Sequence, residues 1–184
     1  MNRGEALQLL KEKLSNKNLI KHSLAVEAAM RSLADYFEKD PEEWGICGLL
    51  HDVDYDQTKD DMDLHSKKGA EILKEKGLDP EICDAVLTHN EAHGIEPKTL
   101  MGKALFCVDP LTGLIVAATL VLPSKKIKDL ETENVLNRFK EGAFARGANR
   151  EIIAQCEPYL GLSLEAFINI VLSSMKNISS DLGL

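Results

Sequence analysis

The stretch Leu49-Leu50-His51-Asp52-Val53-Asp54 decides how this chain folds, because it sets the polar pair His51 and Asp52 inside an apolar run. The residues before it, from Trp44 onward, are nearly all apolar and predict a buried helix. Burying an unpartnered histidine and aspartate costs several kcal/mol or shifts their ionisation. A divalent cation removes that cost, since imidazole nitrogen and carboxylate oxygen together bind Fe, Mn, Zn or Ni. The stretch therefore predicts part of a metal site.

The overall composition is that of one soluble globular domain. The chain has 184 residues, enough for a single core, and its contents of 44% hydrophobic and 28% charged residues are ordinary for such a protein. The net charge of −8 argues against a basic patch, so we expect no bulk binding of nucleic acid. A small anionic substrate stays compatible with this charge, because a bound metal and a few basic residues reverse the field locally.

The cysteines and the apolar runs favour a soluble protein of the cytoplasm. The N-terminal residues lack the apolar core of a signal peptide, and the longest apolar run, 111–123, is too short to span a membrane. We therefore expect no membrane partner, and nothing in the sequence indicates the oligomeric state. Four widely spaced cysteines without a C-x-x-C pair lie in apolar surroundings, which predicts buried reduced thiols: Cys47, Cys83, Cys107 and Cys156.

Helical periodicity covers almost the whole chain, and no segment alternates as a strand would. Asp40-Pro41 and Asp79-Pro80 each combine a helix-capping aspartate with a proline of the first turn, and Asn149 is a further candidate cap. We expect Pro110 to end one helix at Asp109 and to start another, because proline cannot continue the hydrogen-bond ladder. The expected helices span residues 4–15, 18–38, 41–53, 65–76, 80–93, 99–109, 110–121, 131–141, 149–158 and a last segment after 163.

The domain organisation follows from what the chain lacks. No internal repeat, low-complexity tract or linker divides it. We therefore expect one all-α domain over residues 1–184, with a core of about 19–150 on which the helices of about 149–184 pack. The exact packing of these helices does not follow from the pattern.

Side chains of the ligand type share helix faces with apolar residues, since every third or fourth residue of a helix lies on one face. His22 is in line with Val26, and His89 follows Val86. A lone inward histidine is more often a hydrogen-bonded core residue, but many inward ligands on separate helices favour convergence on a metal. The inward set is His22, His51, Asp52, His65, His89 and Asp109.

For His93 the sequence predicts a role other than metal binding. It lies four residues after His89, a spacing at which two imidazoles can chelate one ion, but Gly94 follows at once and indicates a helix end. The string also lacks the glutamate that follows the first histidine of a zinc-protease helix. We predict that His93 lies at the solvent edge, near the mouth of a substrate site, rather than on a metal.

The ordered set His22 … His51-Asp52 … Asp109 resembles the H…HD…D signature of the HD-domain metal-dependent phosphohydrolases. The resemblance runs from about residue 19 to about residue 150, with Val53 where the HDIG name has isoleucine and Pro110 where similar sequences often carry an acid. The segments around these residues resemble the small stand-alone HDIG-type members of the family. These segments are 49–55, His65 with 69–73, 89–91, 109–115 and 123–126.

The resemblance implies a helical bundle with the metal site among its central helices. It implies that His22, His51, Asp52 and Asp109 hold one ion, and that His65 and His89 add a second ion bridged by Asp52. We favour two ions over a single ion with the last two histidines binding phosphate. The expected cofactor is a divalent metal, Fe or Mn before Mg, Ni or Zn.

The resemblance also implies hydrolysis of a phosphomonoester or phosphodiester, of a nucleotide or another small phosphate ester, by metal-activated water. Asp52 orients the nucleophile in this hypothesis, and Asp54 is a candidate general base whose alternative is a solvated loop acid. Basic residues that could contact phosphate, each with the alternative of a solvated surface charge, are Lys125, Lys126, Arg138 and Arg146.

Two other functions stay open at this stage. A di-iron oxygenase is possible, because some HD-domain proteins use a similar metal set for oxidative cleavage. A regulatory or binding module without turnover is also possible, although such a protein would be expected to lack a ligand and this sequence has the full set.

Overall fold

The computed structural model describes all residues 1–184 and consists of helices and connecting loops, with no strand. This confirms the all-α prediction. The longer helices are α1 (Arg3–Lys13), α2 (Lys17–Tyr36), α3 (Pro41–Leu50), α5 (Lys67–Glu75), α6 (Pro80–Thr88), α7 (Leu100–Leu120), α8 (Thr132–Lys140) and α11 (Leu164–Asn177). The short ones are α4 (Tyr55–Thr58), α9 (Arg150–Ala154), α10 (Cys156–Leu160), α12 (Ser179–Leu182) and the 3₁₀ turns η1 (Glu91–His93) and η2 (Ile127–Asp129).

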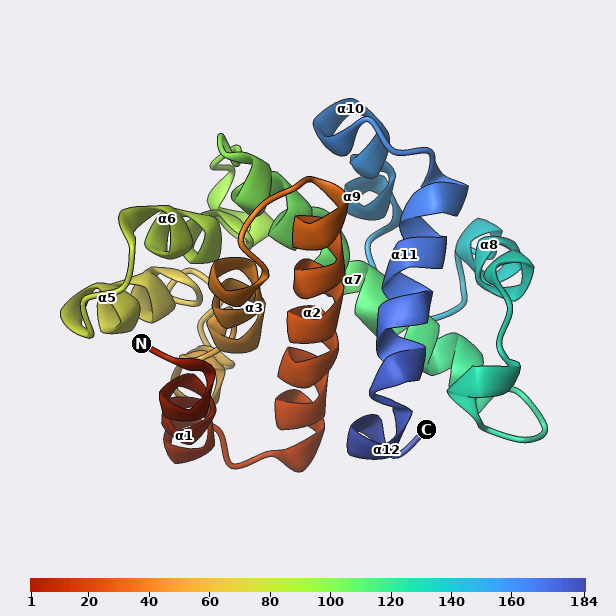
Figure 1. Cartoon of the computed structure of the whole chain (residues 1–184), viewed down its shortest axis with the longest axis horizontal. Coiled ribbons are helices and arrows are strands. Elements are labelled where there is room, and N and C mark those ends of the chain that lie inside the picture. Colours follow the sequence, from red (N-terminus) through yellow and green to blue (C-terminus); the bar gives the residue numbers. More distant parts are fainter.

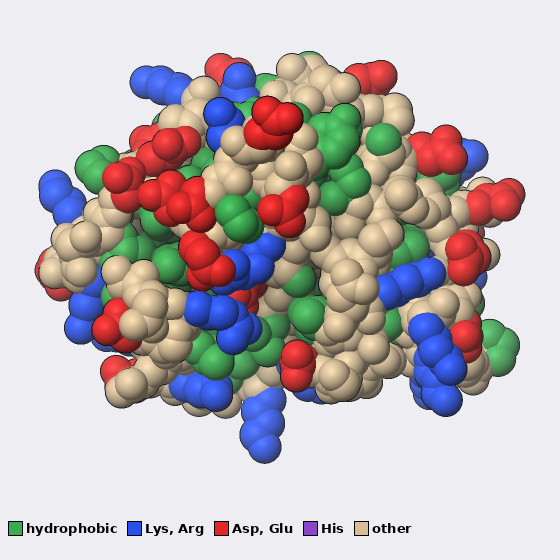
Figure 2. Space-filling view, viewed as in Figure 1, with side chains coloured by type: hydrophobic (Ala, Val, Ile, Leu, Met, Phe, Trp, Pro, Cys, Tyr) green, Lys and Arg blue, Asp and Glu red, His purple; other side chains and the backbone are tan.

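Helices α2 and α7 form the centre of the bundle. α2 lies between α3 on one side and α11 on the other, and α7 crosses behind them, with α5 and α6 beyond α3 (Figure 1). One connected core of 43 buried hydrophobic residues extends from Ala6 in α1 to Leu182 in α12. On the face seen in Figure 2, acidic and basic side chains are interspersed and no histidine is visible.

The helix starts follow the capping signals in the sequence. Asp40 and Asp79 each accept a hydrogen bond from the backbone N–H two residues on, with proline at the first helical position. Asn149 caps α9 in the same way, accepting from the N–H groups of Glu151 and Ile152. These caps satisfy backbone donors that a helix start leaves free, which is why the boundaries were predictable.

Two glycines let α3 approach α2 closely. A Cβ at Gly48 would lie 2.9 Å from the carbonyl oxygen of Val26 and 3.0 Å from Cγ of Met30. A Cβ at Gly45 would overlap the side chain of Arg31. The absence of these two side chains brings the end of α3, where His51 lies, against α2.

The predicted break at Pro110 is wrong, because α7 runs without interruption from Leu100 to Leu120. Pro110 has no N–H to donate to the carbonyl of Phe106, a loss that commonly costs about 3 kcal/mol or more. Both halves of the helix are nonetheless buried along one side, at Leu105 and Leu114 for example. Burying two aligned apolar segments in one core outweighs one missing hydrogen bond. Asp109 therefore lies in the middle of a long helix instead of at an end.

Because it is continuous, α7 is long and apolar enough to cross a membrane by length and composition, with a mean hydropathy of 1.6. More than half of that stretch, 56%, is buried inside the protein. The core helix of a bundle has the same properties, so this feature is weak evidence for a membrane span.

Candidate metal centre

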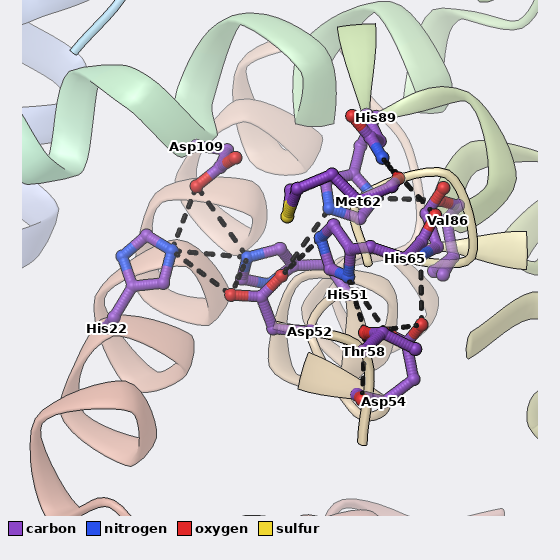
Figure 3. Close-up of polar contacts among 12 residues, drawn as sticks. His22, His51, Asp52, Asp54, Thr58, Met62, His65, Val86, His89 and Asp109 are labelled. Carbon is purple, nitrogen blue, oxygen red and sulfur yellow. Dashed lines mark hydrogen bonds and ion pairs between the residues drawn. The ribbon is translucent and has the colours of Figure 1, made fainter. Parts of the chain in front are cut away.

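Three helices bring the first group of ligand-type side chains together. His22 comes from α2, His51 follows the last residue of α3, and Asp109 comes from the middle of α7. Nε2 of His22 lies 2.9 Å from Oδ1 of Asp109 and 3.2 Å from Nε2 of His51. The distance from His51 Nε2 to Asp109 Oδ1 is 3.7 Å. Three donor atoms therefore face one small volume (Figure 3).

A second group lies on the other side of Asp52. Oδ1 of Asp52 is 3.3 Å from Nε2 of His65 and 3.5 Å from Nε2 of His89. Its other oxygen, Oδ2, is 3.4 Å from Nε2 of His51 and 3.9 Å from Nε2 of His22. The carboxylate of Asp52 thus lies between two sets of histidines (Figure 3). The structure brings together all six residues that the sequence singled out as ligands.

Two of the histidines are oriented by backbone carbonyls one helical turn earlier. Nδ1 of His51 lies 2.8 Å from the carbonyl oxygen of Gly48, and Nδ1 of His89 lies 2.6 Å from that of Val86. A carbonyl only accepts hydrogen bonds, so Nδ1 carries the proton in both rings. In the neutral ring, Nε2 is then left with a lone pair that points into the cluster.

The other two histidines face side-chain acceptors. Nδ1 of His22 lies 3.2 Å from Oγ1 of Thr112, whose own hydroxyl donates to the carbonyl of Asp109. Nδ1 of His65 lies 3.2 Å from Oδ1 of Asp54. These contacts assign the proton to Nδ1 in both rings as well, which is the outer-shell pattern of histidines that bind metals through Nε2.

This arrangement fits a divalent cation. Four imidazole lone pairs and the carboxylates of Asp52 and Asp109 face one another without a donor among them, so a cation or added protons must neutralise them. Without metal, burial acts to lower the pKa of His51, but the adjacent carboxylates outweigh burial and raise it well above its usual range. The nitrogen and oxygen donors match the ligand preference of first-row divalent metals. The cluster is thus suited to divalent metal binding.

The segment around His65 is held by unusual backbone geometry. Ser66 has a φ of 68°, in the left-handed region that non-glycine residues rarely adopt. Its N–H donates to Oδ2 of Asp54 at 2.9 Å, and its hydroxyl donates to the carbonyl of Leu87. Gly69 leaves room for this contact, since a Cβ there would lie 3.0 Å from Asp54 Oδ1. These hydrogen bonds offset the backbone strain at Ser66. The resulting backbone geometry orients His65 toward the cluster.

Asp54 is therefore neither a solvated loop acid nor a residue of the cavity wall. Its side chain is fully buried behind His65, and it is absent from the lining of the cavity over the cluster. The sequence did not reveal this, because it offered only a general base or a solvated loop acid as roles for Asp54. The position suits a residue that orients His65 and does not suit a general base in contact with substrate.

The cluster forms the floor of a cavity of about 350 Å³. Apolar side chains form part of its walls, among them Tyr55, Phe106 and Ile152, and no lysine or arginine lines it. Residues of the wall that sequence reasoning did not select include Leu19, Met62, Asn90, Glu91, Gly147 and Asn149. Only Asn90 and Glu91 had a signal, since they directly follow His89 in the string that carries the resemblance.

The predicted phosphate contacts do not reach this cavity. Lys125 lies in the exposed loop after α7, and Arg138 on α8 pairs with Glu141 at 2.8 Å. Leu120, the last residue of α7, is already roughly 16 Å along the helix axis from Asp109. His93 lies against the backbone of the neighbouring segment, with Nε2 2.6 Å from the carbonyl oxygen of His65, and not in the cavity wall.

Comparison with known proteins agrees with this geometry. A model of the HD-domain family matches residues 19–136. Ribonuclease Y of Lawsonia intracellularis is 30% identical over 139 residues, which are 74% of this chain and 26% of that protein. Ribonuclease Y proteins of Nitratidesulfovibrio vulgaris and Sulfurovum sp. are 29% and 30% identical over 140 residues, 74% of this chain and 27% of each relative. The chain thus spans about a quarter of the length of these relatives. No solved structure gives a significant match.

Proposed function

The chain belongs to the HD-domain family, and on this premise we propose that it is a metal-dependent phosphohydrolase. The bond cleaved is a phosphoester of a nucleotide or short oligonucleotide, and Asp52 would lie between two divalent ions. The main support for the proposal is that the two oxygens of the Asp52 carboxylate point to different pairs of histidines. One oxygen faces His22 and His51, and the other faces His65 and His89. A carboxylate that bridges two ions through both of its oxygens would present them in this way.

The roles of the other residues follow from this arrangement. His22, His51 and Asp109 would hold one ion, while His65 and His89 would hold the other. Bound divalent ions supply Lewis acidity at the phosphoryl group and make water easier to deprotonate. The acceptors behind each ring place the proton of the neutral imidazole on Nδ1, so Nε2 is the nitrogen that would face an ion. The 1–184 chain acts as one domain in this proposal, with the helices after about 149 closing one wall of the cavity.

The cavity supports a nucleotide as the substrate. Its lining has no cationic side chain, so bound metal is the natural counterion of the scissile phosphate there. The apolar side chains Tyr55, Phe106 and Ile152 offer surface for a base. The relatives are named as ribonucleases, which supports a phosphodiester of RNA among the candidate substrates. Recognition of one phosphodiester within the cavity does not require a basic protein surface, which the net charge of −8 argues against.

The nitrogen-rich donor set favours Fe or Mn over Mg, which prefers oxygen ligands and water. The same donor set makes a di-iron oxygenase the alternative that must be tested. The two functions differ in what is consumed, because a hydrolase uses water and an oxygenase uses dioxygen and redox-active iron.

The test combines metal content with turnover. Wild-type protein reconstituted with Mn or Fe is expected to hold about two ions per chain by elemental analysis and to hydrolyse bis(p-nitrophenyl) phosphate or p-nitrophenyl phosphate. Asp52→Asn should lose metal and activity together. Asp60→Asn, an exposed acid on the following loop, is the matched control and should change neither. A wild type that binds no metal, or one that consumes oxygen with a mixed-valence iron signal and hydrolyses neither ester, would overturn the proposal.

A further inference from the structure

A second cavity of about 340 Å³ adjoins the cavity over the metal cluster. The two share four lining residues: His22, Asp109, Pro110 and Gly147. The second cavity differs from the first in having a cation, Arg146, in its wall. A ligand that occupies the metal cluster can therefore extend along Asp109 toward a guanidinium.

Arg146 is free to bind such a ligand. Its side chain is exposed and makes no ion pair or hydrogen bond within the chain, in contrast to Arg138 nearby, which pairs with Glu141. A guanidinium in the wall of this cavity without a carboxylate partner is suited to phosphate, which it can bind through two parallel hydrogen bonds.

The loop that carries Arg146 is held in one shape by Arg150. Burial lowers the pKa of Arg150, and its guanidinium has no carboxylate partner and donates to backbone carbonyls of the loop instead. Ala145, just before Arg146, has a φ of 45°, a left-handed geometry that needs such support. The carbonyls that accept from Arg150 are those of Arg138, Phe139, Glu141, Phe144, Ala145 and Ala148.

The other end of the loop is tied to the wall of the first cavity. Nδ2 of Asn149 donates to Oε2 of Glu91 at 2.7 Å, and both residues line that cavity. The loop 141–149 is thus fixed to α8 at one end and to the metal-site wall at the other. Arg146 is presented from a preorganised segment, which lowers the entropic cost of using it for binding.

We propose that Arg146 binds a second phosphate of the substrate, next to the phosphate at the metal cluster. The substrate class is then a nucleotide with two consecutive phosphates, joined either directly as in a nucleoside diphosphate or through a nucleoside as in a dinucleotide with a 5′-phosphate. This inference rests on the proposed function, because the metal cluster must hold the first phosphate.

The experiment measures binding to the Mn-loaded protein by calorimetry, using AMP, ADP and the dinucleotide pApA as probes. Wild type is expected to bind ADP or pApA more tightly than AMP, and the probe preferred identifies the linkage. Arg146→Gln should reduce that preference by roughly tenfold or more, the range for hydrogen bonds to charged groups. AMP affinity and metal content should stay within about twofold of wild type. Arg146→Lys, which keeps the charge but not the paired donors, should retain part of the preference.

Lys126→Gln is the matched control. It also removes one exposed positive charge, taking the net charge from −8 to −9, but lies in the loop after α7 and should leave the preference unchanged. Equal binding of AMP, ADP and pApA by a wild type that holds its metal would overturn the inference and leave the proposed function standing. A preference that survives in Arg146→Gln, or falls equally in Lys126→Gln, would also overturn it. Failure of the wild type to take up metal would overturn the proposed function, and this inference with it.

Discussion

The carbonyl oxygen of Gly48 accepts a hydrogen bond from Nδ1 of His51 at 2.8 Å. Gly48 thereby fixes the proton of His51 on the side away from the cluster. The same glycine has no room for a side chain, because its Cα faces the backbone of α2 at Val26. One residue thus sets both the spacing of α2 and α3 and the orientation of a candidate ligand.

Gly48→Ala is expected to lower the free energy of unfolding by about 1–3 kcal/mol, the range for overpacking a tight contact. Metal affinity should fall as well, since the end of α3 must move away from His22. Urea unfolding followed by circular dichroism measures the first effect, and metal titration measures the second. Gly113→Ala in α7 meets nothing within 4 Å and should be neutral or stabilising. Equal unfolding midpoints for Gly48→Ala and wild type would contradict the packing argument.

Asp54→Asn is expected to weaken one ion and spare the other. Asp54 contacts His65 and the N–H of Ser66 but none of the other histidines. Loss of an outer-shell partner commonly lowers metal affinity by roughly 10–100-fold, so the affinity for the ion at His65 and His89 should fall by that factor. Calorimetric titration with Mn should then resolve one tight and one weak step. Two unchanged steps, or equal weakening of both, would show that Asp54 does not act through His65.

The metal-free protein is expected to lose stability as the pH rises. Burial acts to lower the pKa of His65, but Asp52 and Asp54 outweigh it and raise this pKa to about 9. The pKa of His65 in the unfolded chain is near 6.5. The contribution of protonated His65 to the free energy of unfolding is therefore fully present below about pH 6.5 and is lost as the pH rises through about 9. Its size is on the order of 3 kcal/mol.

Urea unfolding of chelator-treated protein from pH 6 to 10 checks this dependence. The midpoint should fall across the window in wild type and much less in His65→Gln. Metal affinity should change in the opposite direction, because protons compete with the ion for Nε2 and are released when it binds. A midpoint that stays flat or rises between pH 6.5 and 9 would contradict the assignment.

Arg150→Gln is expected to loosen the loop 141–149 without removing metal. The variant loses the guanidinium that holds the loop carbonyls, while the ligands lie on other elements. Trypsin should then cleave after Arg146 at least several-fold faster than in wild type, and the dependence of ADP or pApA binding on Arg146 should disappear. Unchanged cleavage kinetics would mean that Arg150 does not hold the loop. A simultaneous loss of metal would point to general unfolding instead.

Several features of this protein were readable in the sequence because they depend on local physics. The caps at Asp40, Asp79 and Asn149 act within one helical turn, and the structure confirms each. The ligand-type residues stood out because polar side chains in apolar runs require a partner. The structure gathers all six of these residues, and their binding of metal stays a prediction.

Other features depended on contacts between segments far apart in the chain. Pro110 predicts a helix break locally, but packing on both sides of it keeps α7 continuous. Lys125 and Arg138 looked as suitable for phosphate as Arg146, yet only Arg146 lies beside the cluster. All three side chains are cationic, and what separates them is where the fold places the loop or helix that carries each.

The sequence alone determined which side chains could bind a metal and which segments would be helical, since residue type, periodicity and capping are properties of the chain itself. Only the tertiary structure decided that the two oxygens of Asp52 point to different pairs of histidines, that Asp54 lies behind His65, and that Arg146 lines the same cavity as Asp109. The physical reason is that distances between residues on different helices are set by how closely the helices pack. That spacing depends on contacts such as Gly48 against Val26, which no local pattern encodes.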